Sequence, residues 1–253
     1  KYKYGEDAAS DVLFIRHSKS NKQYRIQNAV NPIFSPDSNW IAYSINEKSK
    51  KINTIYLHQL SNGRVYNWNS KGTYRFLDNG DKFMIHHNKE LMFFNLVEFK
   101  KHYIANVSAY LIDEKGDILV YAIESKNMIG NGIYSYNFKT KETRSLDRTP
   151  YQYKMLSWNH DKSGFAGIKF LTCGKKNKEI IIFTFLNISS PDYIHREYNW
   201  RDIAGRTQHE PFAITNPNID KIIWSKDNKR FFLDLISDND VLKQNDKLTV
   251  DIW

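Results

Sequence analysis

The chain has 253 residues, of which 41% are hydrophobic and 15% aromatic, and its 37 basic and 28 acidic side chains give a formal charge of +9. This apolar content supports a packed core and excludes global disorder, while 11 glycines and 6 prolines exclude collagen-like and linker-like chains. No run approaches the ~18 apolar residues of a membrane span, and the single cysteine, Cys173, excludes an internal disulfide framework.

Short strands separated by turns dominate the sequence. Brief runs of aromatic and β-branched residues suit a pleated, half-buried surface. A sustained 3.6-residue period is missing, and only residues 193–205 leave room for a helical turn. The pattern therefore predicts strands throughout. In chain order, the clearest runs are residues 40–44, 54–58, 82–86, 118–122 and 132–136.

The strands recur as a repeat in which a large apolar residue, the anchor, precedes a tight polar turn. The clearest copies are Phe34-Ser-Pro-Asp-Ser-Asn-Trp-Ile-Ala-Tyr and Trp224-Ser-Lys-Asp-Asn-Lys-Arg-Phe-Phe-Leu; weaker copies begin at Phe76, Ile112 and Trp158. A unit of about 40 residues and four strands cannot bury both of its faces alone, so neighbouring units must stack, as propeller blades do. We therefore predict an all-β fold, a β-propeller of four-stranded antiparallel blades. It is expected to be partial, with about five blade motifs plus edge strands.

The repeat also makes predictions about single residues. Side chains alternate across a strand, so a large apolar group at the same place in every unit is expected to be buried. The polar corner after each anchor is expected to face solvent. The residues expected near these corners are Asp37, Asn79, Lys115, Asp161 and Asp227.

The spacing of the anchors suggests the domain organisation. Trp158 and Trp224 are 66 residues apart, which is longer than the other spacings and predicts an insertion between blades at residues 192–215. Residues 1–253 are otherwise interpreted as a single β-propeller domain or fragment. Within the insertion, Tyr198, Trp200 and Arg201 are the candidate binding residues, because an exposed tryptophan could stack on a ligand.

Two segments carry a family resemblance. Residues 34–43, with their partner strand at residues 55–57, resemble the blades of prolyl oligopeptidase-type and TolB-like propellers. Residues 222–232 and 245–253 are similar to the propeller of exported, dipeptidyl-peptidase-like members of the prolyl oligopeptidase family from Bacteroidetes-type bacteria. In that family the propeller caps a C-terminal α/β-hydrolase domain, limits access to a serine nucleophile and helps to select short peptides. The resemblance therefore implies a periplasmic or otherwise exported bacterial protein, although no signal peptide begins this chain.

The catalytic part of that family is absent from this chain. A nucleophile elbow requires Gly-x-Ser-x-Gly, and no two of the 11 glycines are four residues apart. The hydrolase domain is expected beyond Trp253, so no catalytic residue is assigned, and no cofactor or metal is expected. The predicted function is that of a substrate-gating and recognition propeller of a serine peptidase. Its expected partners are its own hydrolase domain and short peptides.

Other functions remain open on the sequence alone. The fold could instead provide a non-enzymatic, TolB-like or WD-repeat-like platform for protein partners. A weaker third reading, polyanion binding, follows from the charge, but the basic residues are spread along the chain, so we expect no nucleic-acid partner. His86 and His87 form the most metal-like pair, yet adjacent strand residues point to opposite faces, so one core and one surface residue are expected.

Overall fold

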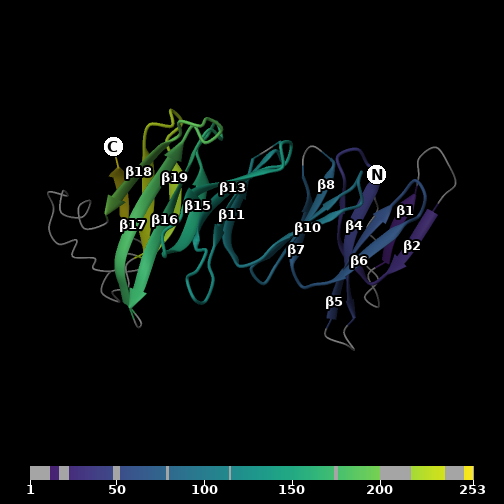
Figure 1. Cartoon of the computed structure of the whole chain (residues 1–253). Coiled ribbons are helices and arrows are strands. Elements are labelled where there is room, and N and C mark those ends of the chain that lie inside the picture. The colour runs from purple at the N-terminus through teal and green to yellow at the C-terminus, as the bar shows by residue number, and fades with distance from the viewer. Residues whose placement is uncertain are drawn as a thin grey trace. The chain divides into compact units, whose positions relative to one another are not determined.

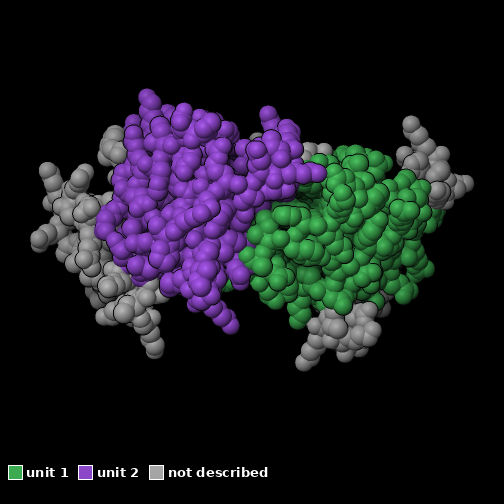
Figure 2. Space-filling model, in the orientation of Figure 1, with its two compact units in different colours: residues 1–105 green, residues 106–253 purple. Residues whose placement is uncertain are grey.

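The computed structural model describes residues 12–16, 23–47, 52–77, 80–113, 115–173, 176–199, 218–236 and 248–252. Within these ranges every regular element is a β-strand (Figure 1). The chain divides into two compact units, residues 1–105 and residues 106–253, which Figure 2 colours separately. Among the described residues there is no helix, and hence none long and apolar enough to cross a membrane.

Unit 1 contains a hairpin and two four-stranded antiparallel sheets whose strands follow sequence order. The hairpin pairs β1 (Val12–Arg16) with β2 (Gln23–Gln27). Sheet 1 consists of β3 (Ala29–Phe34), β4 (Trp40–Glu47), β5 (Ile52–Gln59) and β6 (Val65–Asn69). Sheet 2 consists of β7 (Thr73–Phe76), β8 (Lys82–His87), β9 (Glu90–Asn95) and β10 (Lys101–Ile104).

Unit 2 repeats this pattern with three sheets. Sheet 3 consists of β11 (Val107–Ile112), β12 (Ile118–Ile123), β13 (Gly132–Asn137) and β14 (Glu142–Asp147). Sheet 4 consists of β15 (Gln152–Trp158), β16 (Phe165–Cys173), β17 (Lys176–Leu186) and β18 (Ile194–Asn199). Sheet 5 consists of β19 (Asn218–Trp224), β20 (Phe231–Ile236) and β21 (Leu248–Ile252).

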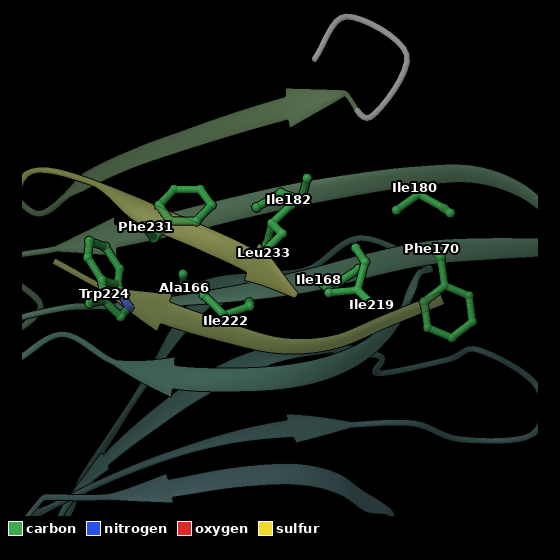
Figure 3. Close-up of a cluster of buried hydrophobic side chains, with 10 residues drawn as sticks. All are labelled: Ala166, Ile168, Phe170, Ile180, Ile182, Ile219, Ile222, Trp224, Phe231 and Leu233. Atoms are coloured by element: carbon green, nitrogen blue, oxygen red, sulfur yellow. The ribbon is translucent and has the colours of Figure 1, made fainter. Parts of the chain in front are cut away.

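Consecutive sheets within a unit pack face to face. In β12, four successive residues from Leu119 to Ala122 are buried, which requires cover on both faces because side chains alternate across a strand. One core cluster joins sheets 1 and 2, with Leu57 of β5 and Phe83 of β8 among its members. A second joins sheets 3 and 4, and a third joins sheets 4 and 5, where side chains of β16, β17, β19 and β20 gather between the sheets (Figure 3).

Four-stranded antiparallel meanders that follow one another in sequence and stack face to face are the blades of a β-propeller. The fold class predicted from the sequence is therefore confirmed: the protein is all-β and built of propeller blades. No strand pairing between different sheets occurs within the described ranges, which agrees with a partial propeller. The prediction of one domain over residues 1–253 stays a prediction.

The anchors occupy equivalent positions in the five sheets. Each is the last residue of the first strand and pairs with a residue at or next to the start of the second, as in Ile112 with Leu119 and Trp224 with Phe231. Phe76 and Trp224 are buried, and the other three anchors are half-buried. Full burial at all five was therefore too strong an expectation, since the first strand has fewer neighbours than the central strands.

The corner after each anchor has one geometry throughout. The first backbone N–H of the corner donates to the carbonyl five residues later, and the fourth N–H donates back to the first carbonyl. The fourth residue has a positive φ each time, which glycine and asparagine tolerate best. Asp37, Lys115, Asp161 and Asp227 are exposed beside their corners, as predicted, and Asn79 lies outside the described residues. At the five corners, this fourth residue is Ser38, Gly80, Gly116, Lys162 or Asn228.

Two expectations concern the segment after β17. The sequence left room for a helical turn within residues 193–205, but residues 194–199 form β18, the fourth strand of sheet 4. The pairing of β18 with β17, continuous over six residues, explains the difference, because the neighbouring strand holds in place a segment that has little apolar character of its own. The remaining residues of the expected insertion, from 200 to 215, lie outside the described ranges, so the insertion stays a prediction there.

Candidate functional site

An open hollow of about 690 Å³ lies in unit 1 at one end of sheets 1 and 2. It is formed where β5 begins, β6 ends, β7 begins and β8 passes into its turn. The connection from one sheet to the next therefore passes beside it. The lining residues are Asn53, Asn69, Ser70, Lys71, Gly72, Thr73, His86, His87 and Asn88.

Gly72 holds the connection against the end of β8. A Cβ atom at this position would lie 2.2 Å from the backbone oxygen of His86 and 2.8 Å from the Cβ of His87, distances that real Cβ atoms essentially never show. Only glycine allows this approach. The close packing brings the polar connection and the two histidines to the same hollow, although they are more than ten residues apart in the sequence.

Backbone and side-chain hydrogen bonds fix the rim of the hollow. The N–H of Ser70 donates to the carbonyl of Asn53 at 3.0 Å, which fastens the connection to β5. The Ser70 Oγ accepts from the N–H of Gly72 at 3.0 Å. The hydroxyl of Thr54 donates to Asn69 Oδ1 at 3.2 Å, which leaves the Asn69 amide group able to donate elsewhere.

The charge of the lining is positive or neutral. Lys71, His86 and His87 can carry positive charge, and none of the nine lining residues is acidic. Burial, and then the nearby charge of His87, lower the pKa of His86 below its ordinary value. The hollow therefore offers amide, hydroxyl and imidazole groups, together with the ammonium group of Lys71.

The structure corrects the expectation for the histidine pair. His86 and His87 are both half-buried and both line the hollow, so the predicted division into one core and one surface residue is wrong. The pair ends β8, and the following residues Asn88 and Lys89 have φ values of 48° and 63°. The strand turns there, and the strict alternation of faces ends with it. In the described part of the chain, no group of three or more His, Cys, Asp or Glu residues could hold a metal ion.

Of the three residues proposed from the sequence as binding contacts, the structure describes Tyr198. Trp200 and Arg201 are outside the described residues. Tyr198 is half-buried on β18 and packs against the core cluster between sheets 4 and 5, where its ring centroid is 6.2 Å from that of Phe231. A binding role for these three residues stays a prediction. The signal that the sequence offered for the hollow was the Ser70-Lys-Gly-Thr connection, which carries polar groups and a glycine directly after a strand.

A cluster of charged side chains lies in unit 2 between sheets 3 and 4. Lys169 is 1% exposed, and its Nζ donates to Asp147 Oδ2 at 2.9 Å and to Glu197 Oε1 at 2.5 Å. Burial opposes the ionisation of Asp147, but the hydrogen bond and charge of Lys169 outweigh it and lower the pKa of Asp147. Lys169 also lies 5.1 Å from the ring centroid of Tyr151. Because its carboxylates satisfy the buried ammonium, this cluster connects two sheets and is not the candidate binding site.

Comparison with known proteins gives structural neighbours only. No protein-family model and no curated protein matches the sequence. Solved structures similar to this chain include the β-propeller domain of the trilobed protease from Pyrococcus furiosus, at 12% identity and a TM-score of 0.45, which covers 90% of this chain and 70% of that one.

Two further structures are similar at the same level. Kuenenia stuttgartiensis hydrazine synthase matches at 8% identity and a TM-score of 0.47, covering 88% of this chain and 67% of that one. TolB from Acinetobacter baumannii matches at 15% identity and a TM-score of 0.40, covering 89% and 57%. The fold assignment rests on the strand order and sheet packing described above.

Proposed function

We propose that this chain is a recognition propeller that binds short peptides and has no catalytic role of its own. The observation that carries the proposal is the hollow in unit 1. Its asparagine, serine and threonine side chains supply both donors and acceptors, which match the alternating N–H and C=O groups of an extended peptide. An open hollow lined by such side chains suits a ligand that binds through its backbone.

The wider role that we propose is substrate selection for a serine peptidase of the prolyl oligopeptidase type. The blade motif at residues 34–43 and the C-terminal segment at residues 222–232 support it through their resemblance to that family. The absence of Gly-x-Ser-x-Gly from the sequence supports a role in recognition alone, because cleavage would then belong to a separate hydrolase domain. In such an arrangement the propeller would admit short peptides and exclude folded chains.

A titration tests the binding role directly. We expect N-acetyl-Ala-Ala-Pro-Ala-amide to bind the purified chain in isothermal titration calorimetry, with a dissociation constant on the order of 10⁻⁴ M, typical of a small open site. Asn88→Gly removes a lining amide and keeps a residue suited to the φ of 48°, so it should weaken binding several-fold.

The matched control for that variant is Asn106→Gly. Asn106 is also exposed and has a φ of 60°, but it lies in unit 2, outside the lining of the hollow. This control should bind the peptide as the unchanged chain does. Equal weakening by both variants, or the absence of heat with any peptide, would contradict the proposed function.

A further inference from the structure

We infer that the hollow in unit 1 recognises the carboxylate at the free C-terminus of its peptide. The inference rests on the proposed function and adds the chemical group that the ligand must carry. It assigns the basic side chains of the hollow, those of Lys71, His86 and His87, to that carboxylate. The neutral asparagine and hydroxyl groups would then contact the preceding peptide units.

The first argument is the composition of the lining. Of nine residues, three carry basic side chains and none carries an acidic one, although the chain as a whole has 28 acidic residues. The Lys71 ammonium would repel a ligand amine, whereas it would donate a charge-assisted hydrogen bond to a carboxylate, which is roughly twice as strong as a neutral one.

The second argument is the position of the basic groups. Lys71 is in the connection before β7, and Thr73 at the start of β7 pairs with His86 in β8. Gly72, between them, leaves no space for a side chain against β8. Basic groups from two segments therefore line the same hollow, where a single carboxylate with two oxygen atoms could accept from both segments.

Other charged groups stand near the hollow but outside its lining. Glu90 pairs with His87 across β8 and β9, and Lys89 lies in the turn between them. Arg75 lies on β7, two residues beyond Thr73. Glu47 pairs with Ile52, the residue before Asn53, so the acidic neighbours Glu47 and Glu90 stand beside the basic neighbours Lys89 and Arg75. The lining itself remains free of acidic residues.

The geometry also predicts how binding depends on pH. Burial is the main cause that lowers the pKa of His86, so its ring is neutral at pH 7. A carboxylate placed beside it favours the protonated ring and raises that pKa. Binding should therefore take up protons, and affinity should rise as the pH falls from 7 to 6.

The experiment compares three peptides on the full chain by calorimetry at pH 6.5. N-acetyl-Ala-Ala-Pro-Ala with a free C-terminus should bind about 10-fold more tightly than its C-terminal amide, the gain expected for a charge-assisted hydrogen bond. N-acetyl-Ala-Glu-Pro-Ala-amide carries its carboxylate on a side chain and should bind like the amide. Titration in two buffers of different ionisation enthalpy should show proton uptake with the free acid only.

A charge variant with a matched control completes the test. Lys71→Gln should reduce the preference for the free acid over the amide to about threefold or less. Lys126→Gln, at an exposed turn of unit 2, should leave both affinities as they are.

The outcomes separate this inference from the proposed function. Equal binding of acid and amide would overturn the inference and leave the proposed function standing. Tighter binding of the glutamate peptide than of the free acid would overturn the assignment to the C-terminus. Failure of all three peptides to bind would contradict the proposed function itself.

Discussion

His58 is the residue whose environment fits its chemistry least well. It lies on β5, is 5% exposed, and neither of its ring nitrogens has a hydrogen-bond partner within the described structure. Its ring meets that of Tyr24 edge-on, with centroids 4.6 Å apart, where the N-terminal hairpin covers sheet 1. Burial lowers the pKa of His58, because a positive charge there would lose its hydration.

Replacing His58 should therefore stabilise the protein. We expect His58→Leu to raise the free energy of unfolding by about 1–2 kcal/mol, since an unsatisfied buried polar group is exchanged for an apolar one. As pH falls below 6.5, the unfolded chain protonates this histidine before the folded chain does, so wild-type stability falls and the variant should lose less. Urea denaturation at pH 7 and pH 5 measures both effects. A variant that is less stable at pH 7, or equally sensitive to pH, would contradict this interpretation.

Lys169 presents the opposite case, a buried charge that is fully paired. Lys169→Met leaves the Asp147 carboxylate buried without its counter-ion, so we expect a loss of about 3–5 kcal/mol in the free energy of unfolding. The double variant Lys169→Met with Asp147→Asn should recover part of that loss, because both charges are then gone. Urea denaturation measures the free energy of unfolding of each variant in this double-mutant cycle. If the losses from the two single changes simply add in the double variant, Lys169 and Asp147 are not coupled.

At the scale of the element, the anchors connect neighbouring sheets as well as filling the core. Trp224 donates from Nε1 to the carbonyl of Ser157 at 3.1 Å, and Trp158 donates in the same way to the carbonyl of Ile112 at 3.1 Å. In both cases the acceptor belongs to the first strand of the preceding sheet. A tryptophan at the end of a first strand therefore fixes how that strand lies against its neighbour.

Truncation of the buried anchor should be costly. We expect Trp224→Ala to lower the free energy of unfolding by about 3–5 kcal/mol, because the side chain leaves a cavity and its hydrogen bond is lost. Trp224→Phe should lose less, since it fills most of the same space. Thermal and urea unfolding of both variants measure the difference. Equal stability of Trp224→Ala and the wild type would contradict the packing between sheets 4 and 5.

The corners are a second element whose chemistry can be tested. Asp113 Oδ1 accepts from the N–H groups of Asp117 at 2.7 Å and Ile118 at 2.8 Å, and Asn159 fills the same position in sheet 4 and accepts from Gly164 at 3.0 Å. Asp113→Ala should therefore cost about 1–2 kcal/mol, whereas Asp113→Asn should cost little. Urea denaturation compares them, and equal losses from the two changes would show that the acceptor oxygen is unimportant.

At the scale of the whole molecule, local patterns predicted the sheets well. An apolar residue before a polar turn constrains only its own hairpin, so Phe34 and Trp224 identified their corners without knowledge of the rest of the chain. The long spacing after Trp158 was harder to interpret. Part of this spacing arises from the lengths of β16 and β17, which have 9 and 11 residues. The insertion expected at residues 192–215 begins before β18, so the expected range includes that strand.

The hollow could not be predicted from the sequence in the same way. Its lining comes from Asn53, the connection at residues 69–73 and the turn at residues 86–88, and these segments meet only through the packing of sheet 1 on sheet 2. The alternation rule separated His86 from His87 because it holds within a strand and not at its end. Gly72 lies where the connection approaches the end of β8 closely. A single glycine in a polar connection predicts such an approach only once the partner strand is known.

Chemical-shift mapping by NMR tests most directly whether unit 1 carries a peptide site. The ¹⁵N-labelled chain is titrated with N-acetyl-Ala-Ala-Pro-Ala. We predict that the shifted backbone and side-chain amide signals concentrate on Asn53, Asn69, Gly72 and Asn88, with little change in unit 2. Shifts that concentrate in unit 2, or no shifts at millimolar peptide, would contradict a recognition site in the hollow.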